Sequence, residues 1–339
     1  MVNEKVKTGV RAKINTRVRR KSKVTKIEEQ PLHIESVTQN DVTWINIEPP
    51  SERETEYLAQ HYPFHPLDLD DCLSRIQRPK IDEYKDYIFL VLHFPVFNPE
   101  ARVTNPSQLS VFISENYLIT LHKGDLKPIV ALFRDCELNE DTRLEHFSQG
   151  TGYLLYRIVD RLVDYCLPII SKISANIEKT EENIFQSQGV PGAIWEISTL
   201  RHDVIAFRRI IWPMRAVVAT LEPKIRRFTG MDLAPYFGDM TDHVDKIWDA
   251  LDEFKEIIEG ISDTHNSLVT NRTNNVMKMM TVIATILIPF LAVSGIYGMN
   301  VGLPGGLEAG SLHSFIVLII IMALIACGML LFFRWRRWI

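Results

Sequence analysis

Hydrophobic and polar residues follow different periods in the two parts of the 339-residue chain. Between residues 31 and 150, short runs of β-branched and aromatic residues, bounded by Pro, Asn and Gly, are interspersed with segments of helical spacing. This mixture predicts an α/β domain over residues 31–150. The strand-like runs are VTWINIE, DYIFLVLHFPVF, QLSVFIS and YLITLHKG, and the helical segments are ERETEYLAQHY and PLDLDDCLSRI.

From Thr151 onward, strand signals disappear and apolar residues recur every three or four positions. The Gly and Pro of QSQGVPGA divide residues 151–234, which predicts an antiparallel helical hairpin. A longer helix begins near Pro235, and residues 235–299 should form one helix because no proline or clear cap intervenes before Pro289. Its seam has coiled-coil-like spacing and consists of Val244, Ile247, Trp248, Leu251, Phe254, Ile258, Ile261 and Leu268.

Two runs without a formal charge, residues 279–299 and 312–333, meet the length test for crossing a bilayer. Each holds roughly 20 residues, which as a helix span about 30 Å of hydrocarbon. We therefore expect two transmembrane helices, the first of which continues from the long helix. The helix over 235–299 is then a stalk that enters the membrane.

The distribution of Lys and Arg sets the orientation of these spans. The loop over residues 300–311 has no Lys or Arg and one acid, whereas Arg272 and Lys278 precede the first span and the tail over 334–339 is basic. Positive charge stays on the cytoplasmic side. The loop should be extracytoplasmic and both termini cytoplasmic, in a multi-pass protein of the cell (inner) membrane.

The overall net charge of -4 and hydrophobic content of 46% conceal this uneven distribution. Residues 1–30 form a basic arm, whose first 26 residues carry ten Lys or Arg and one acid. The arm has no apolar core, so it is no secretory signal, and we expect it to be disordered, with acidic lipid as an alternative partner. It has no interleaved aromatic residues, so we expect no nucleic-acid partner. The four cysteines are far apart, which argues against a disulfide framework or a zinc site.

No motif supports catalysis. The chain contains no Walker loop, no G-x-G-x-x-G and no G-x-S-x-G, so nucleotide and hydrolase chemistry have no basis. His202 and Asp203 could act as a base and its orienting group, but no nucleophile motif accompanies them, and we interpret them as an exposed helical pair. We expect no catalytic residues and no enzyme.

A second stripe along the long helix suggests a different activity. It is polar at the cytoplasmic end, apolar through the membrane and small at the outer end, which fits a narrow water path better than a lipid face or a helix dimer. Two spans cannot enclose such a path, so we expect a homo-oligomer with closed rotational symmetry, with the second span as a lipid-facing collar. The stripe consists of Asp263, Thr270, Asn274, Met277, Thr281, Ala284, Ile288, Leu291 and Gly295.

Several motifs resemble those of the CorA family of divalent-cation channels. The most specific is YGMN, residues 297–300, before a terminal second span. NRTNNVMKMMTVIATILIP, QRPKIDEYKDYIFLV, HPLDLDDCL and PYFGDMTDH extend the resemblance over most of the chain beyond the arm. The resemblance implies an α/β cytoplasmic domain, a long-helix stalk and two C-terminal transmembrane helices in a funnel-shaped homo-oligomer, a pentamer.

The resemblance also implies roles along the pore. Asn300, with Gly298 and Met299, corresponds to the outer ring that holds a hydrated magnesium ion, and magnesium keeps its water shell tenaciously. Met277 and Met280 correspond to a hydrophobic gate that closes by dewetting. Asn274 corresponds to the cytoplasmic mouth, and most members have Leu at Met280 and many have Thr at Leu291.

Three acids match regulatory positions of the family. Asp71 and Asp239 fall where an acidic pair binds Mg²⁺ across the subunit interface, and Asp263 matches a further acidic ring on the stalk. Facing carboxylates repel unless a divalent cation lies between them, so intracellular magnesium can hold subunits closed and its loss can release them. Magnesium would then be both the transported and the regulatory ion.

The outer loop departs from the magnesium branch. It reads VGLPGGLEAG, with Gly305 where Glu is expected, and resembles the zinc-transporting ZntB branch. A ZntB-like zinc transporter is therefore an alternative, and so is a membrane-anchored metal-responsive sensor. The residues leave the choice among Mg²⁺, Co²⁺, Ni²⁺ and Zn²⁺ open.

Overall fold

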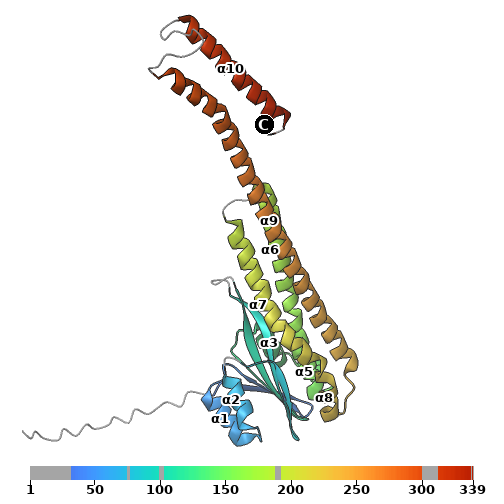
Figure 1. Cartoon of the computed structure of the whole chain (residues 1–339). Coiled ribbons are helices and arrows are strands. Elements are labelled where there is room, and N and C mark those ends of the chain that lie inside the picture. Colours follow the sequence, from blue (N-terminus) through green and yellow to red (C-terminus); the bar gives the residue numbers. More distant parts are fainter. Residues whose placement is uncertain are drawn as a thin grey trace, which may run out of the picture. The chain divides into compact units, whose positions relative to one another are not determined.

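A computed structural model describes residues 32–74, 77–98, 103–187, 192–299, 312–336 and 338 (Figure 1). Apart from Leu32, these residues belong to one compact unit, His33–Ile339. The basic arm over 1–30 and the loop over 300–311, with Asn300, lie outside the described residues. The expectations for them therefore stay predictions.

The α/β part is built on a six-stranded sheet with the order β1-β2-β6-β5-β4-β3. Neighbouring strands are antiparallel except β2 and β6, which are parallel. The four predicted strands are present, and the pattern missed two further strands, β1 and β3, whose side chains are mostly not buried. The strands are β1 (Ile34–Gln39), β2 (Val42–Ile47), β3 (Lys80–Glu83), β4 (Ile88–Asn98), β5 (Val103–Ile113) and β6 (Tyr117–His122).

Helices cover both faces of this sheet. Helices α1 (Glu52–His61) and α2 (Pro66–Leu73), both predicted, pack with Phe89 and Val91 of β4. The alternate β4 residues, such as Leu90, belong to the core shared with the other helices. Successive strand residues point to opposite faces of a sheet. Because both faces are covered here, apolar residues are favoured at every position of β4, which explains its continuous apolar run. The helices on the second face include α3 (Lys127–Leu138) and α4 (Glu140–Phe147).

The helical region is divided more finely than the hairpin expected for residues 151–234. The first arm is split into α5 (Gly150–Asp164) and α6 (Cys166–Ser187), and the second into α7 (Ala193–Ala219) and α8 (Leu221–Thr229). Each break lies just before a proline, Pro168 or Pro223. Proline has no N–H to donate to the carbonyl four residues earlier, which weakens the helix at both breaks, although Pro213 and Pro289 leave α7 and α9 continuous.

The long helix α9 (Ala234–Tyr297) is continuous over 64 residues, as predicted. It packs against α5, α6 and α7 through the predicted seam. Six seam residues are buried, and Trp248 and Leu268 are partly buried. Helix α10 (Leu312–Trp335) follows and meets α9 where Met322 and Ile325 approach Pro289. Both α9 and α10 are long and apolar enough to cross a membrane.

The prediction that His202 and Asp203 form an exposed helical pair is wrong for Asp203. His202 is exposed on α7, but Asp203 is buried, and its Oδ1 accepts a hydrogen bond of 2.8 Å from the backbone N–H of Thr104. A buried carboxylate needs such a partner because desolvation without one is costly. The pair is therefore no base with its orienting group: Asp203 ties α7 to the start of β5.

A second buried polar group, His122 at the end of β6, makes stability depend on pH. Its Nδ1 accepts from the N–H of Gly124 at 3.0 Å, and its Nε2 lies 3.0 Å from Oδ1 of Asn46. The ring is therefore neutral, with the proton on Nε2. Burial lowers the pKa of His122 to about 4.

The free energy of unfolding should therefore fall as the pH drops from about 6.5 to about 4, because an unfolded histidine binds its proton first. The loss from this side chain is about 3 kcal/mol. Circular dichroism melts at pH 7.5 and 4.5 measure it. His122→Gln should be less stable at pH 7.5 yet lose less on acidification. The exposed-site control His202→Gln should behave as wild type, and the same pH dependence in all three proteins would contradict this account.

Candidate ion pathway and metal sites

The predicted pore stripe lies along α9 and is uncovered in the single chain. Its members from Asn274 to Gly295 are all exposed, with Met277 at 61% and Leu291 at 71%. Every residue from 271 to 281 is exposed, so no other described element packs on that stretch of helix. Apolar surface of this extent needs a cover of lipid or protein.

Threonine hydroxyls along this helix donate hydrogen bonds to backbone carbonyls four residues earlier in the same helix. The hydroxyl of Thr281 donates to the carbonyl of Met277 at 2.8 Å, and that of Thr285 donates to the carbonyl of Thr281 at 2.7 Å. Thr270 makes the same bond to Asn266. A hydroxyl whose hydrogen is used in this way keeps lone pairs that accept from water. Thr281 can therefore accept a hydrogen bond from the water shell of a cation.

Helix α9 ends at its C-terminus without a left-handed turn. The N–H of Gly298 donates to the carbonyl of Ser294 at 2.9 Å, and Met299 donates to Ile296. A Cβ at Gly298 would come within 3.0 Å of the Ser294 carbonyl oxygen, whereas a Cβ at Gly295 would meet no atom of the described residues within 4 Å. Gly295 thus leaves room for a neighbouring helix, while Gly298 is also constrained by its own helix.

Near the start of α9, an acid–histidine cluster brings together Asp160, Asp164 and His243. One ligand atom from each residue lies within 4.8 Å of the others. The carboxylate of Asp239, one turn before His243, lies 3.9 Å from its Nε2, and the carboxylate of Asp164 lies 3.9 Å from its Nδ1. This Nδ1 is enclosed and has no hydrogen-bond partner among the described residues. The imidazole therefore stands between two carboxylates that it does not hydrogen-bond.

The electrostatics of this cluster favour a cation. Burial, and then the neighbouring carboxylate of Asp164, raise the pKa of Asp160. A cation placed among these groups would relieve the repulsion between carboxylates. Carboxylates suit hard ions such as Mg²⁺, whereas imidazole also suits Zn²⁺ and Ni²⁺. The cluster can therefore bind a divalent cation without distinguishing strongly among them.

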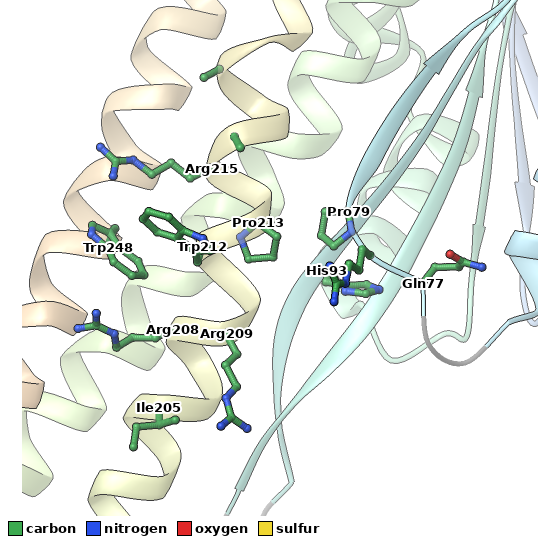
Figure 2. Close-up of a pocket in the computed structure, with 13 residues that line it drawn as sticks. Gln77, Pro79, His93, Ile205, Arg208, Arg209, Trp212, Pro213, Arg215 and Trp248 are labelled. Atoms are coloured by element: carbon green, nitrogen blue, oxygen red, sulfur yellow. The ribbon is translucent and has the colours of Figure 1, made fainter.

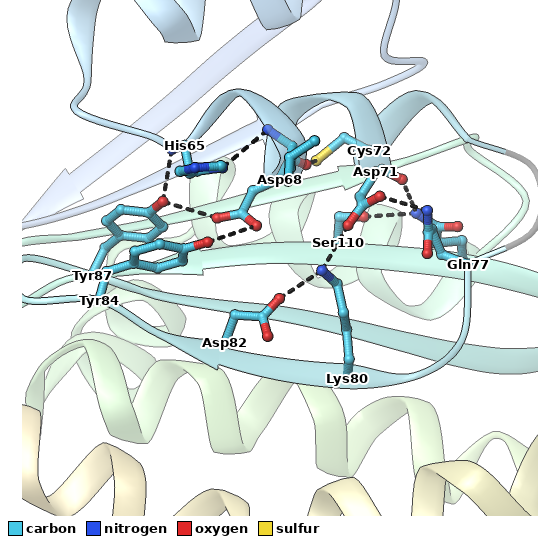
Figure 3. Close-up of polar contacts among 12 residues, drawn as sticks. His65, Asp68, Asp71, Cys72, Gln77, Lys80, Asp82, Tyr84, Tyr87 and Ser110 are labelled. Atoms are coloured by element: carbon cyan, nitrogen blue, oxygen red, sulfur yellow. Dashed lines mark hydrogen bonds and ion pairs between the residues drawn. The ribbon is translucent and has the colours of Figure 1, made fainter.

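Asp71, on α2, belongs to a separate polar cluster (Figure 3). Its Oδ2 lies 2.7 Å from Nζ of Lys80, and the same ammonium lies 2.6 Å from Oδ2 of Asp82. Gln77 donates a further side-chain hydrogen bond to Asp71. Partial burial opposes charge on Lys80, but its bonds to Asp71 and Asp82 prevail and raise the pKa of the ammonium. The Asp71 carboxylate therefore already has a cationic partner.

Asp68, one turn before Asp71, holds α2 in place. It is buried and accepts hydrogen bonds from the hydroxyls of Tyr84 at 3.2 Å and Tyr87 at 2.9 Å. The side-chain amide of Gln108 on β5 donates to the backbone carbonyl of Asp71 at 2.9 Å. The main chain around Asp71 is thus fixed to the sheet, which limits how far its side chain can move.

The predicted regulatory acids are thus not gathered in one chain. Asp71 lies in the Lys80 cluster, Asp239 is 61% exposed beside His243, and Asp263 is exposed farther along α9. The sequence reasoning missed Asp160, Asp164 and His243. A signal was available, because Asp160 and Asp164, like Asp239 and His243, are four residues apart and so share one helix face.

A groove rich in arginine lies between α7, α9 and the sheet (Figure 2). Arg208 pairs with Asp252 and lies 4.5 Å over the ring of Trp248, and Arg215 pairs with Asp245. Arg78 and Arg209 have no ion pair within the described parts of the chain, so the groove carries excess positive charge. Its volume is about 1130 Å³, and it is lined by Gln77, Arg78, Pro79, His93, Ile205, Arg208, Arg209, Trp212, Pro213, Arg215, Ala216, Ala219 and Trp248.

The sequence of this chain is similar to a known protein family and to characterised relatives. A family model described as CorA-like Mg²⁺ transporter protein matches residues 39–337. The cobalt/magnesium transport protein CorA of Thermotoga maritima is 30% identical over 301 residues, which cover 88% of this chain and 83% of that protein.

Solved structures show the same fold. The complete CorA magnesium transporter from Methanocaldococcus jannaschii matches with a TM-score of 0.77 at 23% identity, covering 89% of this chain and 94% of that chain. The ZntB cytoplasmic domain from Vibrio parahaemolyticus matches with a TM-score of 0.55 at 13% identity, covering 69% of this chain and 88% of that chain.

Loss of one carboxylate should weaken cation binding by the acid–histidine cluster. Asp164→Asn should lower the affinity for Co²⁺ by at least about tenfold, because even a residue that only supports a metal ligand is commonly worth that much. Calorimetric titration of the full-length protein with Co²⁺ measures the change. Asp242→Asn removes an exposed carboxylate of α9 outside the cluster and should bind as wild type. The interpretation fails when the two variants bind Co²⁺ equally.

Proposed function

Since the chain belongs to the CorA family of Mg²⁺ transporter proteins, the resemblance indicated by its motifs is confirmed, and we propose that it forms a passive channel for magnesium. Cobalt and nickel are further permeant ions in this proposal. The observation that carries it is the exposed stripe of α9, polar near Asn274 and apolar from Ala284 to Leu291, on a helix continuous from Asp239 into the apolar span. One chain leaves this stripe without a protein cover.

The stripe becomes a pore only in an oligomer. We propose a closed ring of five copies, a funnel-shaped homopentamer in which α9 of each copy lines the axis and α10 faces lipid. Charge complementarity supports contacts between copies, because Arg78 and Arg209 have no ion pair within the described residues while Asp239 and Asp263 lie exposed on α9. The ring would lie in the cell (inner) membrane with both termini in the cytoplasm.

Selection would occur at the outer end of this pore. Asn300, with the main chain at Gly298 and Met299, would accept hydrogen bonds from the waters of a hydrated Mg²⁺, since this ion gives up its shell reluctantly. Below it, the exposed thioethers of Met277 and Met280 would form the hydrophobic constriction, which blocks ions when it dries. Asn274 would face the cytoplasmic mouth.

Regulation would use acids on the stalk and the sheet domain. We propose that Asp71 of one copy and Asp239 of the next share an intracellular Mg²⁺, with Asp263 forming a further acidic ring. The acid–histidine cluster supports this role, because Asp239 lies among groups that already favour a cation. A bound ion would favour the closed ring to the extent that it binds this arrangement more tightly.

A ZntB-like zinc transporter is the second candidate. The glycine-rich outer loop favours it, and the imidazole of His243 offers a ligand that suits zinc. A sensor in which both spans merely anchor the cytoplasmic part is the third. These candidates differ in driving force and in their need for Asn300.

Replacing Asn300 tests whether the motif lines a pore. Asn300→Ala should abolish Mg²⁺ flux or lower it by at least about tenfold, because it removes the amide oxygen that accepts from the ion's water shell. Dye-reported uptake into liposomes measures the flux, and size-exclusion chromatography checks that the oligomer still assembles. Asn266→Ala, at an exposed residue of α9 outside the stripe, is the control. Wild-type flux through an assembled Asn300→Ala oligomer would favour the anchored sensor.

The driving force separates the two transport candidates. A divalent ion gains about 4.6 kcal/mol at 100 mV, twice the value for one elementary charge. Mg²⁺ should therefore enter liposomes under an imposed potential without any pH gradient. The same assay with Zn²⁺ and an imposed pH gradient is the comparison. Flux that requires the pH gradient and prefers Zn²⁺ would support the ZntB-like alternative.

A further inference from the structure

The proposed regulatory role of Asp71 meets an obstacle within its own chain. Its carboxylate is only 16% exposed, and Nζ of Lys80 lies 2.7 Å from Oδ2. An ammonium and a divalent cation at one carboxylate repel each other strongly over such distances. Mg²⁺ can therefore bind Asp71 at full strength only when Lys80 withdraws.

The surroundings provide a place for Lys80 to go. Oδ2 of Asp82 already lies 2.6 Å from the same ammonium, on the side away from Asp71 (Figure 3). Lys80 and Asp82 belong to the same strand, β3, and are two residues apart, so they share one face of it. By rotation of its side chain, Lys80 can leave Asp71 and keep Asp82 while β3 keeps its pairing with β4.

The rest of this cluster favours a local switch over a large rearrangement. The stem of Lys80 extends over Phe89, with Nζ 5.2 Å from the ring centroid. Lys80 pairs with Val91 in the β3–β4 ladder, and Gln108 holds the main chain at Asp71. The backbone on both sides of the ion pair is thus fixed. Only the ammonium of Lys80 can change its partner, because two carboxylates lie within its reach.

From this geometry we propose that Lys80 is a tethered competitor of the regulatory cation: it bridges Asp71 and Asp82 in the metal-free protein, and it gives up Asp71 and keeps Asp82 when a divalent cation binds Asp71. The proposal rests on the proposed regulatory role of Asp71. Lys80 then acts as a positioning residue that raises the concentration of Mg²⁺ needed to close the ring. Asp82 acts in the opposite direction, because it stabilises Lys80 in the displaced position.

The test is the Mg²⁺ concentration that half-protects the full-length oligomer from limited proteolysis. Lys80→Met keeps the length of the side chain but removes its charge, so it should lower this concentration by about fivefold, the upper range for a partly exposed ion pair. Lys80→Arg keeps the charge and should stay close to wild type. Lys85→Met removes an exposed lysine in the turn after β3 and controls for a general change of charge.

Substitution of Asp82 provides an independent test, in which the half-protecting Mg²⁺ concentration should change in the opposite direction. Asp82→Asn should raise the half-protecting concentration, because Lys80 loses its second partner. The double variant Lys80→Met/Asp82→Asn should match Lys80→Met, since Asp82 acts through Lys80. A purely structural role of Asp82 would instead shift both backgrounds equally. Should Lys80→Met fail to assemble, Lys80→Gln, which also removes the charge, takes its place in both comparisons.

Asp71→Asn separates this inference from the proposed regulation. Protection of Asp71→Asn at wild-type Mg²⁺ concentrations would show that Asp71 binds no regulatory ion, and both proposals would fail. Weakened protection in Asp71→Asn, together with no change in Lys80→Met, would overturn the competitor role alone. When the regulatory role of Asp71 and the competitor role of Lys80 are both correct, Lys80→Met should have no further effect in the Asp71→Asn background.

Discussion

The burial of one seam of α9 against α5, α6 and α7 is the contact on which the rest of the architecture depends. An isolated helix of this length would expose its apolar seam, and most helical stability in proteins comes from packing such a face. Helix α7 packs on α9 and also on β4 and β5, so the same contact joins the sheet to the helix. Asp203 adds a polar tie at the start of β5. The acids of α2 and α9 are therefore held on one connected scaffold.

Much of this scaffold could be predicted from the sequence, because the signals were long and strongly periodic. The seam from Val244 to Ile261 repeats over several turns, and the apolar run of β4 has no competing interpretation within a compact α/β domain. Strand β1 is as long as β2 and β6 but was missed because its sequence, IESVTQ, is mostly polar, and β3 was missed because KIDE is both short and polar. The missing proline N–H was not enough to predict the breaks before Pro168 and Pro223, because Pro213 and Pro289 lie inside continuous helices.

The site was harder to predict, because its chemistry depends on residues that are distant in the chain or compete for one partner. Asp71 was identified through a motif, yet its pairing with Lys80 depends on how α2 lies against β3. Asp160 and His243 belong to different helices, and only their packing brings the carboxylate to the imidazole. Asp203 was interpreted as exposed because helical spacing alone does not show that β5 covers that face. The roles of the stripe residues and of Asn300 stay predictions, since they concern contacts between copies or residues outside those described.

The continuity of α9 also has a mechanical consequence. From Asp239 to Met277 the helix rises through roughly 57 Å, at 1.5 Å per residue, and no described residue in that interval is a proline. A stiff rod of this length acts as a lever. A tilt of only about 2° at its base displaces its far end by roughly 2 Å over that length, comparable to the radius of a water molecule. If α9 lines a pore as proposed, a tilt this small at its base would be large enough, at the level of Met277, to admit or exclude water.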